Sequence, residues 1–515
     1  MNYRNPVLPG FYPDPSVCRV GDDFYLVTSS AEYFPGIPIF HSRDLVHWEQ
    51  IGHCLTRRAQ IPLEGVSPSG GIWAPTIRYH KGIFYVVSTN VDVGGNFIIH
   101  AADPAGPWSD PLLVPMDGID PSLLFDEEKI YLTTNQSAPD GTAGISQAEI
   151  DVNTGKLLSG VRFLWTGSGG RIPEAPHLYH IGEWYYLMIA EGGTMFTHME
   201  TIARSRSPWG PFESCPRNPI LTNINTSDPE VHCVGHGDLV NDKHGNWWML
   251  HLGIRIARKY MSHLGRETFL VPVQWDEAGW PVVNHGRCVT VAGNAAGLHS
   301  VPMATELSRD DFDRGQLNFC WNWIRNPVEE NYSLAKKQGW LSLCASPASI
   351  ASDGSPTLVA RRQKYFDCII ETKLLFEPVA EGQEAGLILF ITGEFYYFLC
   401  KKLVSGTPSI VLEKRAGDFY QTAKIIPAPR GPVVLRAVAS RSAYSFSVVE
   451  QGGREQFLAQ ASTRFLACEV VGRCFTGSFV GMYAVCGSRH PACWAHFDYF
   501  TLEELCDEQT RHPVF

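Results

Sequence analysis

One segment recurs five times in the first part of the chain, and this repeat constrains the fold more than any other feature. Each copy contains a tetrapeptide, a turn and a strand-like run of aromatic and β-branched residues, such as residues 23–28. The copies start at residues 14, 74, 120, 175 and 236 and are therefore 60, 46, 55 and 61 residues apart. Four strands of five or six residues with their turns need about 50–60 residues, which is the size of a propeller blade. We therefore predict an all-β chain that begins with a five-bladed β-propeller; the alternative is a β-sandwich whose spacing is coincidental.

The tetrapeptides place ionisable side chains at similar positions in the repeat. The five tetrapeptides are Asp14-Pro15-Ser16-Val17, Ala74-Pro75-Thr76-Ile77, Asp120-Pro121-Ser122-Leu123, Ala175-Pro176-His177-Leu178 and His236-Gly237-Asp238-Leu239. The first strand of each blade lines the central channel of a propeller, so one set of side chains should meet at one end of it. That set comprises Asp14, Asp120, Glu174 and His236. Ionisable groups are costly to bury together, so their convergence indicates a functional site. Taken singly, each Asp-Pro pair could be a turn, and His236 could be a structural histidine.

The second part of the chain has a different pattern. Residues 292–309 are mostly small, and we predict them to be a linker between a propeller of residues 1–291 and a second domain of residues 310–515. The second domain contains strand-like runs, for example at 433–438 and 444–449, but no acidic tetrapeptide. This alternation predicts a β-sandwich of jelly-roll type.

Charge and composition exclude several classes of partner. The formal net charge is −11 and no cluster of Lys and Arg is present, so we expect neither nucleic acid nor an anionic membrane to bind. No run approaches the roughly 18–20 apolar residues of a membrane helix. The first residues show no basic segment followed by an apolar run, and the 14 cysteines show no metal-ligand spacing. We therefore expect a cytoplasmic protein with reduced thiols; a few disulfides are the alternative.

Three carboxylates with different neighbours suit the hydrolysis of a glycosidic bond. One acid protonates the leaving oxygen, while a carboxylate either activates water or attacks the sugar carbon. A separation of roughly 6.5–9.5 Å between the two carboxyl groups predicts inversion at the anomeric carbon, and about 5–5.5 Å predicts retention. The sequence does not supply this distance, so both mechanisms stay open at this point.

Nine stretches resemble glycoside hydrolase family 43, in the branch of β-xylosidases and α-L-arabinofuranosidases that carry a C-terminal β-sandwich. These stretches are NPVLPGFYPDPS (5–16), YFPGIPIFHSRDLVHW (33–48), GGIWAP (70–75), GIDPSLLFD (118–126), PEAPHLY (173–179), AEGGT (190–194), GHGDLV (235–240), LGRETFLVPVQW (264–275) and FTGSFVGM (475–482). They lie in both predicted domains. Each stretch alone is a weak signal, but together they are specific.

The resemblance implies an inverting mechanism and assigns roles to the three acids. Asp14 matches the general base that deprotonates the attacking water, and Glu174 matches the general acid that protonates the glycosidic oxygen. Asp120 matches a third carboxylate that orients the acid and keeps its pKa high, because a nearby negative charge disfavours ionisation.

The resemblance also implies a set of substrate-binding residues. Arg266 matches the family's substrate-binding arginine, and Trp73 and Phe34 match apolar walls of the sugar site. His236 matches a channel histidine that in several relatives binds Ca²⁺ or water, so it is a candidate calcium ligand, although no cofactor is expected to be required. Phe475 matches a loop of the second domain that closes the pocket and enforces exo action. The alternatives are a surface charge for Arg266 and core packing for Trp73 and Phe34.

We therefore expect an inverting exo-glycosidase that removes terminal D-xylose from β-1,4-linked xylooligosaccharides. One alternative is α-L-arabinofuranosidase activity, alone or in addition, on an arabinose-substituted substrate. The other is a glycan-binding propeller without catalysis. Retaining fructosidases with five blades usually show Arg-Asp-Pro and Glu-Cys signatures, and neither occurs in this sequence.

Two further expectations come from comparing the motifs with the family pattern. Relatives are commonly oligomers, so we expect a homo-oligomer, by analogy alone. The acid motif reads Glu-Ala-Pro-His, where many β-xylosidase relatives have Glu-Gly-Pro-His. The added methyl group of Ala175 is expected to narrow the pocket beside Glu174.

Overall fold

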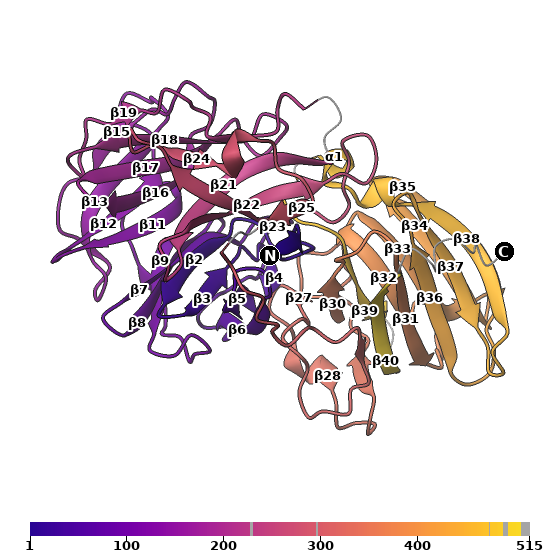
Figure 1. Ribbon diagram of the computed structural model, residues 1–515. Coiled ribbons are helices and arrows are strands. Elements are labelled where there is room, and N and C mark those ends of the chain that lie inside the picture. Colours follow the sequence, from indigo (N-terminus) through magenta and orange to yellow (C-terminus); the bar gives the residue numbers. More distant parts are fainter. Residues whose placement is uncertain (227–229, 295–296, 473, 488–492, 506–515) are drawn as a thin grey trace.

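Almost all regular structure in this computed structural model is β-strand, arranged as a propeller and a two-sheet sandwich that lie side by side (Figure 1). The structure describes residues 1–226, 230–294, 297–472, 474–487 and 493–505. The prediction of an all-β propeller followed by a sandwich is confirmed. Within the described ranges, none of the helices is long and apolar enough to cross a bilayer.

Five antiparallel sheets form the blades, and in each sheet the chain runs from the innermost strand outward. Blade 1 comprises β2 (Ser16–Val20), β3 (Asp23–Val27), β5 (Gly36–Ser42) and β6 (Glu49–Leu55). Blade 2 comprises β7 (Ile72–His80), β8 (Ile83–Asn90), β9 (Gly95–Ala101) and β10 (Leu112–Leu113). Blade 3 comprises β11 (Ile119–Asp126), β12 (Lys129–Asn135), β13 (Ile145–Asp151), β14 (Lys156–Leu157) and β15 (Arg162–Trp165). Blade 4 comprises β16 (Glu174–Ile181), β17 (Trp184–Glu191), β18 (Met199–Ser205), β19 (Glu213–Ser214) and β20 (Leu221–Thr222). Blade 5 comprises β21 (Val231–Asn241), β22 (Trp247–Arg255), β23 (Glu267–Trp275) and β24 (Pro281–Val283).

The innermost strands form a closed ring around the channel. β2 contacts β7, β7 contacts β11, β11 contacts β16, β16 contacts β21, and β21 contacts β2. The N-terminal segment supports this closure, because Leu8 exchanges backbone hydrogen bonds with Thr268 of β23. β1 (Asn2–Arg4) also pairs with β25 (Ala292–Asn294), which follows blade 5. The two ends of the propeller sequence are therefore joined.

The aromatic and β-branched runs of the repeat form the second strand of each blade. These strands are buried because neighbouring blades pack against both of their faces. Val86, Leu187 and Leu250 are fully buried in three separate clusters between blades. Apolar burial of this kind is the main force that holds adjacent blades together.

The first residue of every repeated tetrapeptide has a left-handed backbone conformation. The φ angles are +54° at Asp14, +39° at Ala74, +54° at Asp120, +53° at Ala175 and +53° at His236. The pairing of β7, β11, β16 and β21 with the next strand also shifts register at this point. Residues other than glycine seldom adopt such angles, and bulges redirect side chains. The repeat therefore marks a strained bulge that turns side chains of several blades toward one end of the channel.

A buried polar network links four blades inside the channel. Arg78 of blade 2 lies 2.8 Å from Asp238 of blade 5. Ser16 of blade 1 and Tyr179 of blade 4 donate hydrogen bonds to the same carboxylate, at 2.6 and 2.7 Å. Burial alone would raise the pKa of Asp238, but Arg78 holds that pKa well below its usual range. The carboxylate stays ionised and fully paired, as a buried charge must be.

The second part of the chain forms two packed sheets. One sheet comprises β28 (Tyr332–Ser333), β29 (Leu341–Cys344), β40 (Trp494–Glu504), β31 (Cys368–Leu375), β36 (Val433–Ala439), β37 (Ala443–Val449) and β38 (Glu455–Ser462), with β26 (Arg309–Asp310) paired to β40. The other comprises β30 (Leu358–Arg362), β39 (Phe479–Val485), β32 (Glu384–Thr392), β33 (Phe395–Val404), β34 (Thr407–Ala416) and β35 (Phe419–Pro427). Helical turns lie at η1 (Asn284–Gly286), η2 (Glu329–Asn331), η3 (Thr463–Leu466) and α1 (Cys468–Val471). Inner-facing residues of both sheets make one large apolar core.

The propeller and the sandwich share backbone pairing and apolar packing. β4 (Tyr33–Phe34), from the propeller sequence, pairs with β27 (Trp323–Ile324) of the second part. One apolar cluster contains Phe11 and Tyr33 from the first part together with Ile324 and Phe479 from the second. The two parts therefore bury a common core rather than touching only through polar groups.

The segment predicted as a linker, 292–309, is only partly irregular. It begins with the strand β25 and ends in β26, and residues 295–296 lie outside the described residues. Glu306 of this segment forms ion pairs with Arg361 and Lys364 of the sandwich. The C-terminal residues 506–515 of the predicted second domain also lie outside the described residues.

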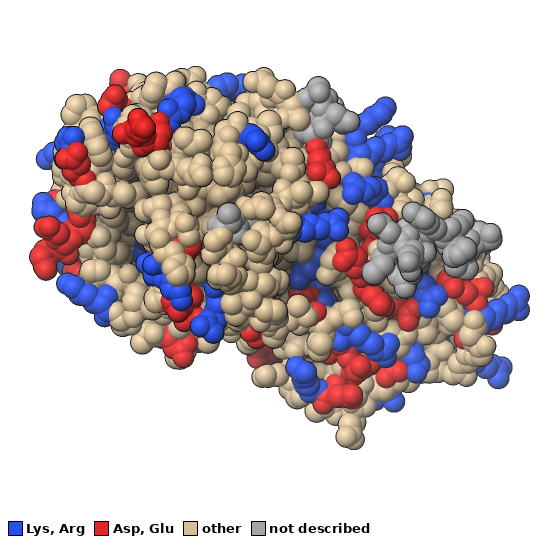
Figure 2. All heavy atoms as spheres, viewed as in Figure 1, with Lys and Arg blue, Asp and Glu red and all other residues tan. Residues whose placement is uncertain are grey.

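Charged side chains of both signs are mixed over the face of the molecule drawn in Figure 2.

Candidate active site

A cavity of about 400 Å³ opens at the end of the channel where the tetrapeptides lie. Residues of all five blades and of the sandwich line it. Seven of the eight residues predicted from the sequence are among them, namely Asp14, Trp73, Asp120, Glu174, His236, Arg266 and Phe475. Segments that are far apart in the sequence thus contribute to one site.

Asp14 is held in place by a serine of its own blade. The hydroxyl of Ser29 donates a hydrogen bond of 2.6 Å to Asp14 Oδ2 and accepts one from the amide of Ala74. Asp14 Oδ1 lies 3.5 Å from His236 Nδ1 and 3.9 Å from Arg266 Nη1. One oxygen is therefore fixed, and the other faces two nitrogen groups at the cavity.

Asp120 is connected to Glu174 through the backbone as well as through its charge. The amide of Ala175, the residue after Glu174, donates a 3.0 Å hydrogen bond to Asp120 Oδ2. Burial raises the pKa of Asp120, and the negative charge of Asp14 acts in the same direction, while His236 and the Ala175 amide oppose it. Asp120 can thus orient the end of the strand that carries Glu174. Its negative charge can also affect the ionisation of the Glu174 carboxyl group.

Glu174 has the environment of a carboxylic acid that keeps its proton. Burial raises its pKa to about 8, and the charge of Asp120 adds to this effect, while Arg266 opposes it. Glu174 Oε1 is buried and has no hydrogen-bond partner among the described residues; the nearest ring nitrogen, His198 Nδ1, is 3.9 Å away. A carboxyl group that is protonated at neutral pH and faces a cavity is suited to donate a proton to a bound molecule.

The walls of the cavity combine two aromatic rings with an arginine. The ring centroids of Trp73 and Phe475 are 5.4 Å apart in an edge-to-face arrangement, and the Arg266 guanidinium lies 5.1 Å from the Phe475 ring. Ser69 joins both rings, because its carbonyl accepts a hydrogen bond from Trp73 Nε1 and its hydroxyl accepts one from the Phe475 amide. The sandwich residue is therefore attached directly to the propeller wall.

The loop that carries Phe475 packs closely against the segment that carries Arg266. The amide of Ser478 donates a 2.8 Å hydrogen bond to the carbonyl of His263. A Cβ atom at Gly477 would lie only 2.2 Å from the carbonyl oxygen of Leu264. Only glycine permits this approach of the two backbones.

Two residues that were expected at the cavity walls are not among those that line it. Phe34 does not line the cavity; it lies in β4, where it pairs with Trp323 of the sandwich, and the two ring centroids are 6.5 Å apart. Its pairing partner is almost 300 residues away in the sequence, so the local pattern could not reveal this packing role. Ala175 borders a small space in the channel that shares Asp14, Asp120 and His236 with the main cavity.

His236 does not belong to a cluster of three metal-binding side chains in the described part of the chain. Ca²⁺ takes about six to eight oxygen ligands. Among the described residues, only Glu384, Cys400 and Glu413 form a group of three side chains close enough to share a metal ion, and His236 is not part of it. That group lies in the sandwich, and both of its carboxylates pair with Lys402.

The sequence reading missed several residues of the site. Ser29 follows the strand β3 and fixes Asp14, but nothing in the pattern distinguishes it from Ser30 beside it. His198 is fully buried behind Glu174, and burial lowers its pKa to about 3, so it is neutral. Ile172 and Met195 line the cavity beside Glu174. Ile172 directly precedes the motif PEAPHLY, and Met195 directly follows the motif AEGGT. This proximity to two motifs was the only feature of the sequence that could have placed them at the site.

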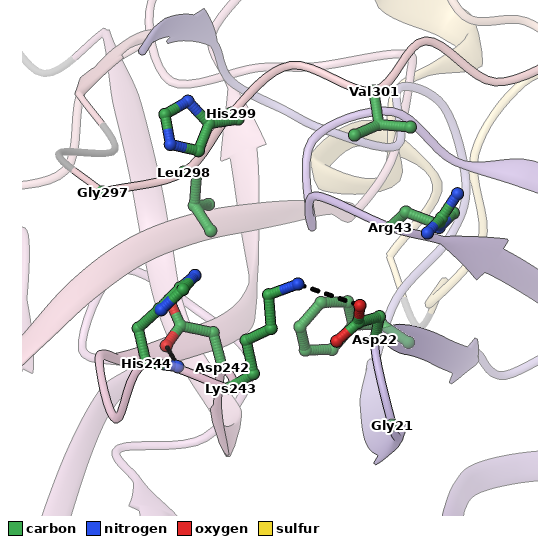
Figure 3. Close-up of a pocket in the computed structure, with 11 residues that line it drawn as sticks. Gly21, Asp22, Arg43, Asp242, Lys243, His244, Gly297, Leu298, His299 and Val301 are labelled. Carbon is green, nitrogen blue, oxygen red and sulfur yellow. Dashed lines mark hydrogen bonds and ion pairs between the residues drawn. The ribbon is translucent and has the colours of Figure 1, made fainter.

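A second cavity lies at the turns that end β2 and β21, at the opposite end of these strands from the tetrapeptide of blade 1 (Figure 3). Two of its charged side chains pair with each other, Lys243 Nζ with Asp22 Oδ2 at 2.9 Å. None of the residues predicted for the site lines it.

Comparisons with known proteins identify both parts of the chain. A family model described as glycosyl hydrolases family 43 matches residues 3–281. A second model, described as the β-xylosidase C-terminal concanavalin A-like domain, matches residues 309–503.

Similar proteins and structures cover nearly the full length. A non-reducing end α-L-arabinofuranosidase of Bacteroides ovatus is 43% identical over 97% of this chain and 94% of the relative. A xylosidase/arabinosidase of Butyrivibrio fibrisolvens is 38% identical over 98% of this chain and 99% of the relative. The crystal structure of a xylan β-1,4-xylosidase of Bacillus halodurans has a TM-score of 0.93 at 34% identity and covers 98% of this chain and 100% of its own.

Proposed function

The chain belongs to glycosyl hydrolases family 43, and from this membership and the geometry of the cavity we propose that it is an exo-acting enzyme that removes single pentose units from non-reducing ends. The protonated state of Glu174 carries the proposal. A buried carboxyl group with a pKa near 8 that faces a cavity has little structural use, but it is the form that a general acid needs.

In the proposed reaction, two carboxyl groups act on opposite sides of the terminal sugar. Glu174 donates its proton to the glycosidic oxygen while Asp14 takes a proton from the attacking water. Asp120 positions Glu174 through the Ala175 amide and favours its protonated form through its charge. Arg266, with the rings of Trp73 and Phe475, holds the sugar.

We propose that hydrolysis inverts the anomeric configuration. Asp14 belongs to blade 1 and Glu174 to blade 4, and β2 and β16 are not neighbours in the ring of inner strands. This arrangement favours the larger carboxyl separation, roughly 6.5–9.5 Å, which leaves room for a water molecule.

The proposed substrate is a xylooligosaccharide with a terminal β-1,4-linked D-xylose. The names of several relatives support this choice, including the β-xylosidase of Bacillus subtilis at 32% identity. The second candidate is a terminal α-L-arabinofuranoside. It is favoured by the name of the Bacteroides ovatus relative, which is more similar to this chain.

The test is a comparison of p-nitrophenyl β-D-xylopyranoside and p-nitrophenyl α-L-arabinofuranoside, with Glu174→Ala as the control. Faster turnover of the xyloside would support the proposed β-xylosidase activity. Faster turnover of the arabinoside would support the second candidate, removal of terminal arabinose. On a xylooligosaccharide, whose leaving sugar oxygen needs a proton, loss of the general acid should lower turnover by roughly 10²–10⁴-fold, so wild-type activity of Glu174→Ala on that substrate would contradict the proposal.

Three expectations from the sequence stay proposals. No metal takes part in the proposed proton transfers, so dialysis against EDTA should leave turnover unchanged. The cytoplasmic location is to be tested by cell fractionation. The homo-oligomer is to be tested by sedimentation.

A further inference from the structure

Exposed apolar side chains border the cavity on the side of Glu174. Ile172 and Met195 line the cavity, yet they are 49% and 69% exposed. Phe196 follows Met195 in the chain, and its ring lies 5.2 Å from that of Tyr260; these residues are 44% and 50% exposed. We call Ile172, Met195, Phe196 and Tyr260 the mouth shelf. Ile172 and Met195 belong to the cavity lining, whereas Phe196 and Tyr260 extend the apolar surface beyond it. Isolated exposed apolar residues are common, but several near the mouth of one cavity indicate a binding surface.

The backbone under the mouth shelf is fixed rather than loose. The amide of Gly192 donates a 2.6 Å hydrogen bond to the carbonyl of Arg171, which joins the segment before β16 to the loop after β17. Within that loop, the hydroxyl of Thr197 donates a 2.6 Å bond to the carbonyl of Gly192, and the His198 amide bonds to the Met195 carbonyl. The exposed side chains are therefore presented by a hydrogen-bonded turn.

Ile172 is also strained. Its φ angle is +55°, which a β-branched residue adopts only against a steric cost. A Cβ atom at Gly193 would lie 3.1 Å from Ile172 Cδ1, so the end of this side chain lies close over the loop. Strain of this kind persists where the surrounding structure enforces it, and it is concentrated at functional sites.

Glu174 sets the direction in which the substrate leaves the cavity. In the proposed reaction, Glu174 protonates the oxygen that joins the terminal sugar to the remainder of the substrate. The next sugar must therefore lie on the side of Glu174. That side carries Ile172, two residues before Glu174, and Met195 on the adjoining loop.

We propose that the mouth shelf binds the sugar ring next to the scissile bond, which is the leaving group of the reaction, through the apolar face of that ring. This inference rests on the proposed function. The shelf offers aliphatic and aromatic surface to the C–H groups of a sugar ring, and burial of both surfaces is favourable. The shelf thus selects an oligosaccharide over a glycoside with a small leaving group.

The test uses two substrates that share one terminal sugar. One is a methyl glycoside, which releases methanol, and the other is the disaccharide, which releases a sugar; the terminal pentose is whichever one the wild-type chain hydrolyses. In Met195→Ala and in Ile172→Ala we expect kcat/KM to fall about tenfold for the disaccharide and to change by less than about twofold for the methyl glycoside, because only the disaccharide contacts the shelf.

Two further variants make the result decisive. Met195→Gln keeps the length of the side chain but makes it polar, so it should show the same selective loss even where truncation harms folding. Leu158→Ala removes an apolar side chain that is 66% exposed and does not line the cavity, and it should change neither substrate.

Three results would overturn the proposal for the shelf. One is an equal loss on both substrates, and another is no loss on the disaccharide. The third is a wild-type dimer that Met195→Gln converts to a monomer with unchanged kinetics, since a second copy of the chain would then cover the shelf. If the wild-type chain hydrolysed neither substrate, the proposed function would fail first and the shelf proposal with it.

Discussion

Glu174 shows how the fold gives one carboxyl group its chemistry. Its ordinary pKa of 4.5 is raised to about 8, chiefly by burial and then by the charge of Asp120. The acid acts only when it is protonated, so activity should be present below this pKa and should fall as the pH rises through it. Asp14 is fixed by Ser29 and faces Arg266, and in the proposed reaction it takes up a proton instead of donating one.

The first prediction concerns the charge of Asp120. Asp120→Asn removes a negative charge near Glu174 but keeps an oxygen that can accept the Ala175 hydrogen bond. The pKa of Glu174 should fall, so the basic limb of the pH profile of kcat/KM should move to lower pH, and turnover should drop.

The control is Asp117→Asn, an exposed aspartate just before β11, which should leave the profile in place. A basic limb at the wild-type position in Asp120→Asn would remove the tuning role of Asp120.

For single residues, the sequence predicted the position in the fold where the residue belongs to the repeated segment. It did not do so for residues outside that segment. Asp14, Asp120 and His236 could be placed at one end of the channel because they begin equivalent tetrapeptides. Phe34 was misplaced because its environment depends on β27, which no local pattern predicts. Ser29 and His198 were missed because they act through contacts that only the folded chain creates.

At the scale of elements, the first residue of every repeated tetrapeptide has a strained left-handed backbone, and in four of the five blades the inner strand is bulged beside it. Proline and aromatic residues allowed the blades to be counted, because they mark the turn and the second strand. The sequence did not reveal the left-handed φ angles, because a glycine is the usual signal for such an angle. Asp14, Ala175 and His236 stand at these positions instead. The short strands β15 and β20 were also not predicted, because both pair at the outer part of a blade with little apolar pattern.

The second prediction concerns the contact between two loops at the cavity. Gly477→Ala places a Cβ atom against the carbonyl of Leu264 and should push the Phe475 loop away from Arg266. Misplacement of binding groups by about 1 Å can cost up to 10²-fold, so we expect kcat/KM to fall roughly 10–100-fold.

The matched change is Gly315→Ala, which adds a methyl group in open space and should leave kinetics unaltered. Wild-type kinetics in Gly477→Ala would show that the close approach of the two loops does not support the site.

At the scale of the whole molecule, the sandwich contributes to the candidate active site and shares an apolar cluster with the propeller. Phe475 lines the cavity, and Arg362 of the sandwich donates a 2.7 Å hydrogen bond to the carbonyl of Phe11. Phe11 and Tyr33 share an apolar cluster with residues of the sandwich. The presence of two domains could be predicted from the change in pattern, whereas their shared core could not, because it joins residues more than 300 positions apart.

The third prediction is that residues 1–306 do not form an active enzyme. Removal of 307–515 exposes the apolar cluster around Phe11 and removes Phe475, so the truncated chain should aggregate or lose hydrolysis of the terminal sugar. Thermal unfolding and turnover are measured on the truncated and full-length chains. A folded propeller with full-length turnover would contradict a role for the sandwich in closing the site.

The central claim is that Asp14 and Glu174 act from opposite sides of the terminal sugar, and the anomeric form of the released sugar tests it most directly. Proton NMR resolves the two anomers of the first product before they interconvert. The account predicts that a β-xyloside releases α-xylose, or that any other hydrolysed pentoside releases the anomer opposite to its own linkage. A first product with the same configuration as the substrate would contradict the role of Asp14 as the base that activates water.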